Sequence, residues 1–371
     1  MAEPLKNQFG ADIPARIAGT IAPVCPAFDV QAVVRDALDG YEALDLMPRG
    51  WKIAHALHRH LPGDYPSAVA VLLEAVHRQP ERTDGGSLAS FFYLPHVCFV
   101  AGYGLDHFEV SMHAQYVLTQ RFTAEFSIRP FLERHPEATL ARLATWATDP
   151  NEHVRRLVSE GTRPRLPWAP RLRAFQQDPR PVLALLEMLK DDPALYVRRS
   201  VANNLNDIGK DHPAVLAETA RRWLLDATDA RRWLVRHALR SAVKRAEPGA
   251  LAALGFGEPA RVRVAQARIT PARAVLGGSV TVVFELTNTG ERPQRVLVDF
   301  QIHFVKASGQ ARPKVFKLKT VELAPHETVT LGKTVSLADL TTRKHYPGHH
   351  AVDAVINGVA QPLGWFQLVP G

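Results

Sequence analysis

A turn followed by an arginine-bearing amphipathic helix occurs three times in this chain, at intervals of roughly 40 residues. The copies span residues 149–156, 192–199 and 229–237. The first two open on Asp-Pro and carry Val-Arg-Arg about one turn later, and the third carries Asp and Val-Arg-His. One such helical pair cannot bury its own apolar stripe, so successive pairs must stack. The spacing therefore predicts HEAT-like helical repeats that form a solenoid with a long concave surface.

The helical pattern stops near residue 257, and short runs of β-branched and aromatic residues follow. Asn357-Gly358 is a hairpin signal between two of them. Six or seven short strands within about 110 residues are typical of an immunoglobulin-like sandwich. We therefore predict a multidomain α + β chain, with an all-α HEAT-like solenoid over 1–257 and an all-β immunoglobulin-like sandwich over 258–371. The strands are expected at 280–286, 296–302, 314–321, 328–335, 350–356 and 365–369.

Composition narrows the classes of function. The two cysteines, Cys25 and Cys98, have no CxxC spacing, which fits a reducing compartment. No signal peptide and no membrane span are recognisable, so we expect a cytoplasmic protein. Two histidine clusters, residues 55–60 and 345–350, lack the spacing of metal ligands. Neither a metal nor an organic cofactor is expected.

Charge is unevenly distributed. The net charge is +8, yet residues 1–148 carry more acidic than basic side chains, and the excess of lysine and arginine lies in 149–245 and 259–371. This asymmetry suggests that the last two thirds of the chain face a polyanion. Solubility alone is the alternative explanation.

Two carboxylates occupy unfavourable helix positions. Glu160 precedes Gly161, and Asp207 precedes Gly209, so each is expected in the last turn of a repeat helix. The carbonyl-rich end of a helix repels negative charge by roughly 0.3–1 kcal/mol. Two such residues in neighbouring repeats indicate a paired-carboxylate site. Local ion pairs with arginines are the structural alternative.

The loop after Glu160 is stiffened by prolines and carries Trp168, Arg163 and Arg165. The indole would suit face contacts with a cationic or sugar-like group, and the arginines would suit phosphates. A tryptophan that caps the core is the alternative.

The paired arginines of the repeats are expected to have different roles. Arg155 and Arg198 should pair with the aspartates of their own turns, Asp149 and Asp192. The arginines that follow them point elsewhere and are better ligand candidates. The predicted DNA contacts are His153, Arg156, Arg163, Arg165, Arg199 and Arg236, with Arg343 and Lys344 in the sandwich.

The run from His153 to Trp168 resembles the signature of the AlkC branch of bacterial alkylpurine DNA glycosylases, and Glu125 to Phe131 resembles a second motif of that family. The resemblance covers roughly residues 1–250, and some members carry a C-terminal immunoglobulin-like domain. It implies excision of 3-methyladenine and 3-methylcytosine by a helical-repeat enzyme that bends DNA without a deep base pocket. It also implies that Glu160, Asp207 and Glu125 form the catalytic carboxylate site and that Trp168 contacts the lesion.

Chemistry agrees with that resemblance. An alkylated base already carries positive charge, so fixed carboxylates need only stabilise the sugar cation and direct a water. No lysine stands in the signature, so we expect a monofunctional enzyme that acts as a monomer on double-stranded DNA. Two alternatives remain: a non-enzymatic binder of bent or damaged DNA, and a protein-interaction scaffold. Binding of methylated DNA without base loss would favour the non-enzymatic binder. Failure to bind duplex DNA even at low salt would favour the protein-interaction scaffold.

Overall fold

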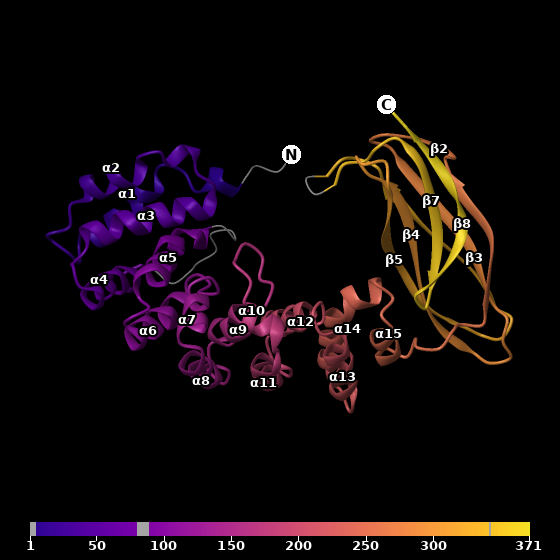
Figure 1. Ribbon diagram of the computed structural model, residues 1–371, viewed down its shortest axis with the longest axis horizontal. Helices are drawn as coiled ribbons and strands as arrows, with labels where there is room; N and C mark the ends of the chain where they lie inside the picture. Colours follow the sequence, from indigo (N-terminus) through magenta and orange to yellow (C-terminus); the bar gives the residue numbers. More distant parts are fainter. Residues whose placement is uncertain (1–4, 80–88, 341–342) are drawn as a thin grey trace. The chain divides into compact units, whose positions relative to one another are not determined.

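The computed structural model describes residues 5–79, 89–340 and 343–371. Helices occupy the chain as far as Ala253 and strands begin at Val262, so the expected boundary at 257 falls between the last helix and the first strand. The predicted α + β class, helical repeats followed by a sandwich, is confirmed (Figure 1). By contacts between residues, one compact unit comprises 1–211 and 229–238, and a second comprises 212–228 and 239–371.

The first unit is entirely helical within the described residues. Proline at the start of several helices and aspartate before others set where they begin: Asp64, for example, accepts a hydrogen bond from the Ser67 amide at 2.9 Å and caps its helix. The apolar face of each helix is buried against its neighbours. The elements are η1 (Leu5–Gln8), α1 (Ile13–Ile21), α2 (Val30–Leu38), η2 (Tyr41–Ala43), α3 (Leu46–His60), α4 (Tyr65–His77), η3 (Ala89–Tyr93), α5 (Leu94–Tyr103), α6 (Phe108–Thr119), α7 (Ile128–Arg134), α8 (Pro136–Trp146), α9 (Glu152–Gly161), α10 (Arg173–Gln177), α11 (Arg180–Leu189), α12 (Leu195–Ile208) and the start of α14 (Asp229–Lys244).

The repeat helices α9 and α12 lie side by side (Figure 1). Val154 and Val197, at equivalent positions of the two repeats, are both fully buried. The turn aspartates shape the helix starts, since Asp149 accepts from the amide of Asn151 and Asp192 from that of Ala194, both at 2.8 Å.

The predicted pairing of each turn aspartate with its own arginine is wrong. Arg155 donates to the main-chain carbonyl of Asp149, and its side-chain partner is Asp192 of the next repeat, at 2.6 and 3.1 Å. Arg198 donates to the main-chain carbonyls of Asp192 and Pro193. An arginine reaches across the seam because the next turn presents a carboxylate in a bidentate position. The pair between Arg155 and Asp192 therefore joins two repeats, whereas Arg198 stays within its own turn.

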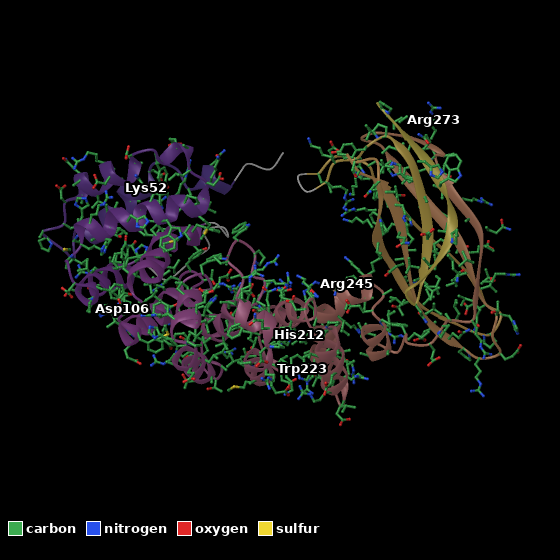
Figure 2. The ribbon with its side chains drawn as sticks, in the orientation of Figure 1. Lys52, Asp106, His212, Trp223, Arg245 and Arg273 are labelled. Carbon is green, nitrogen blue, oxygen red and sulfur yellow. The ribbon has the colours of Figure 1, made fainter. Side chains whose placement is uncertain are left out.

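The second unit contains α13 (Pro213–Leu224), the end of α14, α15 (Pro248–Ala253) and the sandwich. Trp223 of α13 is among the largest fully buried side chains (Figure 2). The three-stranded sheet has the order β1-β3-β6 and the five-stranded sheet β2-β8-β7-β4-β5, with only β2 and β8 parallel among the strand pairs of the described residues. The strands are β1 (Val262–Thr270), β2 (Arg273–Val275), β3 (Ser279–Asn288), β4 (Gln294–Val305), β5 (Ala311–Leu323), β6 (Thr328–Ser336), β7 (Gly348–Ile356) and β8 (Val359–Val369).

All six expected strands are present, and the structure adds β1 and β2. Alternate residues of β3 and β4 point into one core between the sheets, with Phe284 and Phe300 fully buried there. A smaller cluster joins Leu251 and Phe256 to Leu297 on the other face of β4. Within the described residues, no helix combines the length and apolar character needed to cross a membrane.

Candidate active site

A close approach between α7 and α9 brings the candidate site together. A Cβ atom on Gly161 would lie 2.5 Å from Cγ2 of Ile128, so only glycine allows the end of α9 to meet α7 at this distance. Helix α9 ends at Gly161, and the hydroxyl of the next residue, Thr162, donates to the carbonyl of Val158 at 2.8 Å. The loop that carries Glu125 is thereby placed beside the end of α9.

Glu160 and Asp207 lie in the last turns of α9 and α12, as predicted, and both are buried, with exposures of 5% and 2%. One guanidinium joins them. Arg163 donates from Nη1 to Oε1 of Glu160 at 2.6 Å and from Nε to Oδ2 of Asp207 at 2.8 Å. Burial opposes the charge of Arg163, and the two carboxylates outweigh it, so the pKa of Arg163 lies above its usual value. Glu160, Asp207 and Arg163 thus form one hydrogen-bonded cluster.

Glu125 joins the same cluster of side chains through Arg156. The Nη1 atom of Arg156 donates to Oε2 of Glu125 at 2.8 Å, and Nη2 lies 3.6 Å from Oε1 of Glu160. Burial again opposes the cation, but Glu125 and Glu160 raise the pKa of Arg156 above its usual value. The guanidinium carbon lies 4.9 Å from the ring centre of Tyr196, a cation–π contact.

We call these residues the carboxylate–arginine network: Glu125, Arg156, Glu160, Arg163, Asp207 and Lys210, whose Nζ donates to Oδ1 of Asp207 at 2.8 Å. Acidic and basic groups alternate along it, three of each, so its formal charge is zero. The Ser200 hydroxyl donates to Oε2 of Glu160 at 2.6 Å. Both oxygens of Glu160 and of Asp207 are therefore occupied.

Glu125 differs from the other two acids. Its Oε2 atom accepts from Arg156 and from the Thr123 hydroxyl at 2.7 Å. Among the residues that the structure describes, none donates a hydrogen bond to its Oε1 atom. A hollow of about 280 Å³ adjoins this carboxylate, with aromatic walls from Phe91, Phe122 and Tyr196 and with polar groups from Ser90, Thr119, Thr123, His153 and Arg156. Glu125 thus lines the hollow and keeps one carboxylate oxygen that no described residue binds.

Trp168 lies on the Trp168 loop, which we define as residues 162–172. Its side chain is 62% exposed, which rules out the alternative of a core cap. Its φ of 63° is unusual for a bulky residue, so the surroundings must hold the backbone there. One side of the loop faces an apolar cavity of about 260 Å³, whose other walls include Trp51 and Phe126.

The predicted DNA contacts fall into two groups. Arg156 and Arg163 are buried in the network, so their guanidinium groups bind carboxylates in this state. Arg165, on the Trp168 loop, forms a bidentate pair with Asp211, which follows α12. The ring of His153 lies 5.5 Å from that of Tyr196. The exposed candidates in this unit are Arg199 and Arg236.

In the second unit Arg343 is half-buried over the ring of Phe304, at 5.8 Å, and Lys344 is exposed. Burial, followed by the nearby charges of Arg343, Lys244 and Lys306, lowers the pKa of Lys314 on β5. Cations therefore crowd one part of this unit.

Sequence reasoning missed several residues that hold the site. Thr123, Ser200 and Lys210 each donate to a network carboxylate, and Arg129 supports the Trp168 loop from α7. The spacing of Lys210 three residues after Asp207 was a usable signal, because side chains three residues apart can meet where a helix runs into a turn. Within the described part of the chain, no three His, Cys, Asp or Glu side chains are grouped as metal ligands.

A helical-repeat region with a buried network of carboxylates and arginines, followed by an immunoglobulin-like sandwich, defines the class of this protein. Residues 263–370 match the family model described as "Uncharacterised protein YhaZ, C-terminal Ig-like domain". The chain is 38% identical to the uncharacterized protein YhaZ of Bacillus subtilis (strain 168) over 334 residues, 89% of each chain.

The chain also resembles the solved structure of Pseudomonas fluorescens alkylpurine DNA glycosylase AlkC bound to DNA containing an abasic site analog. The identity is 39% and the TM-score 0.92, over 99% of this chain and 100% of that one. This chain belongs to the AlkC-type family of alkylpurine DNA glycosylases, which confirms the resemblance read from the sequence.

Proposed function

We propose that this DNA glycosylase hydrolyses the N-glycosidic bond of cationic alkylated bases in double-stranded DNA, with 3-methyladenine and 3-methylcytosine as its substrate class. Membership of the AlkC-type family supports DNA repair by base excision, and a related protein binds DNA with an abasic site analog, the form of DNA that base loss leaves. The observation that carries the proposal is the convergence of Glu125, Glu160 and Asp207 in one buried network.

The proposed reaction begins with departure of the base. The bond between C1′ and the base nitrogen breaks, and its electron pair neutralises the cationic base, so no acid is required. The sugar becomes an oxocarbenium-like cation, which ordered carboxylates stabilise. A water oxygen then bonds to C1′ and gives up a proton.

Glu125 is the carboxylate best placed to receive that proton. Its Oε1 atom accepts no hydrogen bond from the described residues, and Glu125 lines the hollow of about 280 Å³, in which water would sit. Glu160 and Asp207 have both oxygens engaged and would act electrostatically, with Arg156 and Arg163 holding them in place. Trp168 would pack its exposed indole against the lesion nucleotide.

The enzyme is proposed to be monofunctional and monomeric. Lys210 is the lysine of the network, and its ammonium donates to Asp207, so it offers no free amine for a Schiff base. Reduction with borohydride during turnover should therefore trap no covalent complex with DNA. A trapped complex would contradict this part of the proposal.

The test of base excision uses DNA treated with a methylating agent. The wild-type protein should release methylated bases that chromatography identifies, and Asp207→Asn should release them at least tenfold more slowly. Untreated DNA provides the control for non-specific depurination. Absence of any released base from the folded wild-type protein would refute the function.

The sandwich is proposed to clamp DNA. The crowding of Lys314 by Arg343, Lys244 and Lys306 supports a surface that neutralises phosphates. Replacing Arg343 and Lys344 together by alanine should weaken duplex binding and reduce its salt dependence. Unchanged affinity at low salt would contradict the clamp.

A further inference from the structure

Arg129, near the start of α7, holds both ends of the Trp168 loop. Its side chain is 3% exposed. The Nη1 atom donates to the carbonyl of Gly161 at 3.1 Å and to that of Arg163 at 2.8 Å, and Nη2 donates to the carbonyl of Pro170. One guanidinium thus binds the end of α9 and the two arms of the loop.

The surroundings of Arg129 favour a positive charge but offer it no ion-pair partner among the described residues. The carbonyls at the end of α9 form the negative end of the helix dipole, which attracts positive charge. No carboxylate in the described parts of the chain lies within ion-pair distance of Arg129. Burial lowers its pKa to about 10, so the group stays charged at neutral pH. The planar fork of arginine reaches three carbonyls at once, which the single ammonium of lysine cannot do with the same geometry.

The Trp168 loop depends on these bonds. The amide of Leu172 donates to the carbonyl of Pro164 at 3.2 Å and closes the loop, but Trp168 itself projects into solvent. An exposed indole receives little support from packing, so its position follows from how the loop ends are held. The carbonyl of Arg163 is one of those ends, and the Arg163 side chain joins Glu160 to Asp207.

We infer that Arg129 is a positioning residue for base excision: it fixes the Trp168 loop and the main chain of Arg163, whose side chain joins Glu160 to Asp207, without touching DNA. The inference rests on the proposed function. In this inference Arg129, a buried charge without an ion-pair partner among the described residues, orders the site through hydrogen bonds to main-chain oxygens.

A matched control exists in the same unit. Arg49 is also 3% exposed and donates to the main-chain carbonyls of Lys6, Phe9, Glu42 and Leu44. It differs from Arg129 in that it also pairs with the exposed Glu42 carboxylate, at 3.4 Å. Arg129→Met and Arg49→Met should both lower the melting temperature. Only the Arg129 variant should lose single-turnover base release, by roughly 100-fold, while its Kd for DNA changes little. Arg129→Lys keeps the charge and replaces the methionine variant in this test if the latter does not fold. Its single-turnover rate of base release should also fall at least tenfold.

Two further readouts separate positioning from stability. Arg129→Met and Trp168→Ala should be non-additive, because the second change removes what the first displaces. The fluorescence of Trp168, obtained by difference from a Trp168→Phe protein, should show altered quenching by acrylamide in the Arg129 variant. Quenching needs no substrate, so it tests the inference even if base excision fails. Equal losses of activity in both methionine variants, multiplicative effects with Trp168→Ala, or unchanged quenching would each overturn the inference.

Discussion

Replacing Glu160 by glutamine tests the electrostatic reading of the site. The amide keeps the shape of the side chain, and its oxygen can still accept from Arg163, whose present bond to Glu160 is 2.6 Å long. The formal charge of the carboxylate–arginine network changes from zero to +1. A cationic sugar would then face a net positive surround.

The magnitude follows from Coulomb's law. One unit charge at about 4–8 Å from the sugar, in an effective dielectric of about 20, corresponds to roughly 2–4 kcal/mol. The rate of base release should therefore fall by roughly 30- to 1,000-fold. The free energy of unfolding should fall by about 1–3 kcal/mol. This cost is limited because Arg163 keeps Asp207, and Arg156 keeps Glu125, as charged partners.

Single-turnover release of base from methylated duplex measures the rate, and fluorescence anisotropy measures DNA affinity. Asp192→Asn is the matched control, because Asp192 is 7% exposed and forms a bidentate pair with Arg155 outside the network. Both variants should have a lower melting temperature than the wild type, and only Glu160→Gln should lose activity. Wild-type rates in a folded Glu160→Gln protein would refute the electrostatic argument.

Two other predictions concern parts of the chain outside the network. Alanine at the exposed Arg199 or Arg236 should weaken DNA binding and reduce the slope of log K against log salt by about 0.9 per lost phosphate contact, with release at saturating DNA unchanged; an unaltered slope would show that neither side chain meets phosphate. Burial raises the pKa of Asp299 in the sandwich above its usual value. The contribution of the protonated side chain to stability is therefore complete below the pKa of the unfolded state and is lost as pH rises through the pKa of the folded state. Asp299→Asn, whose amide oxygen can still accept from the Leu318 amide, should therefore gain stability relative to wild type as pH rises from 4 to 8 in urea unfolding; a constant difference across that range would contradict the argument.

Local patterns explain which parts of the fold and site could be predicted. The positions of Glu160 and Asp207 at helix ends follow from a repeat of roughly 40 residues and from glycines near the end of each helix. Their shared partner could be named only as a local arginine. Arg163 lies three residues from Glu160 but 44 residues from Asp207, and the second contact depends on how α9 and α12 pack.

The missed strands have physical causes. β1 contains a bulge between Ala265 and Arg268, and Gln266 has a φ of 50°, so the alternation of buried and exposed residues changes phase within the strand. β2 has three residues, too few for a period to be recognised. The longer strand β3 alternates along its whole length, and β4 alternates from Phe300 onward, after a register shift at Val298 and Asp299, so both were predictable.

The neutrality of the network constrains how it can act. Six alternating charges produce little field at a distance, so selectivity for a cation must come from which atoms face the substrate. The arginines turn their donors toward the carboxylates, and both oxygens of Glu160 and Asp207 are bound from within the protein. Oε1 of Glu125 therefore offers the most direct negative contact among the three acids. The network holds its charges in place before substrate arrives. In the proposed mechanism, only Glu125 would have to bind a water, whose oxygen replaces the base at C1′.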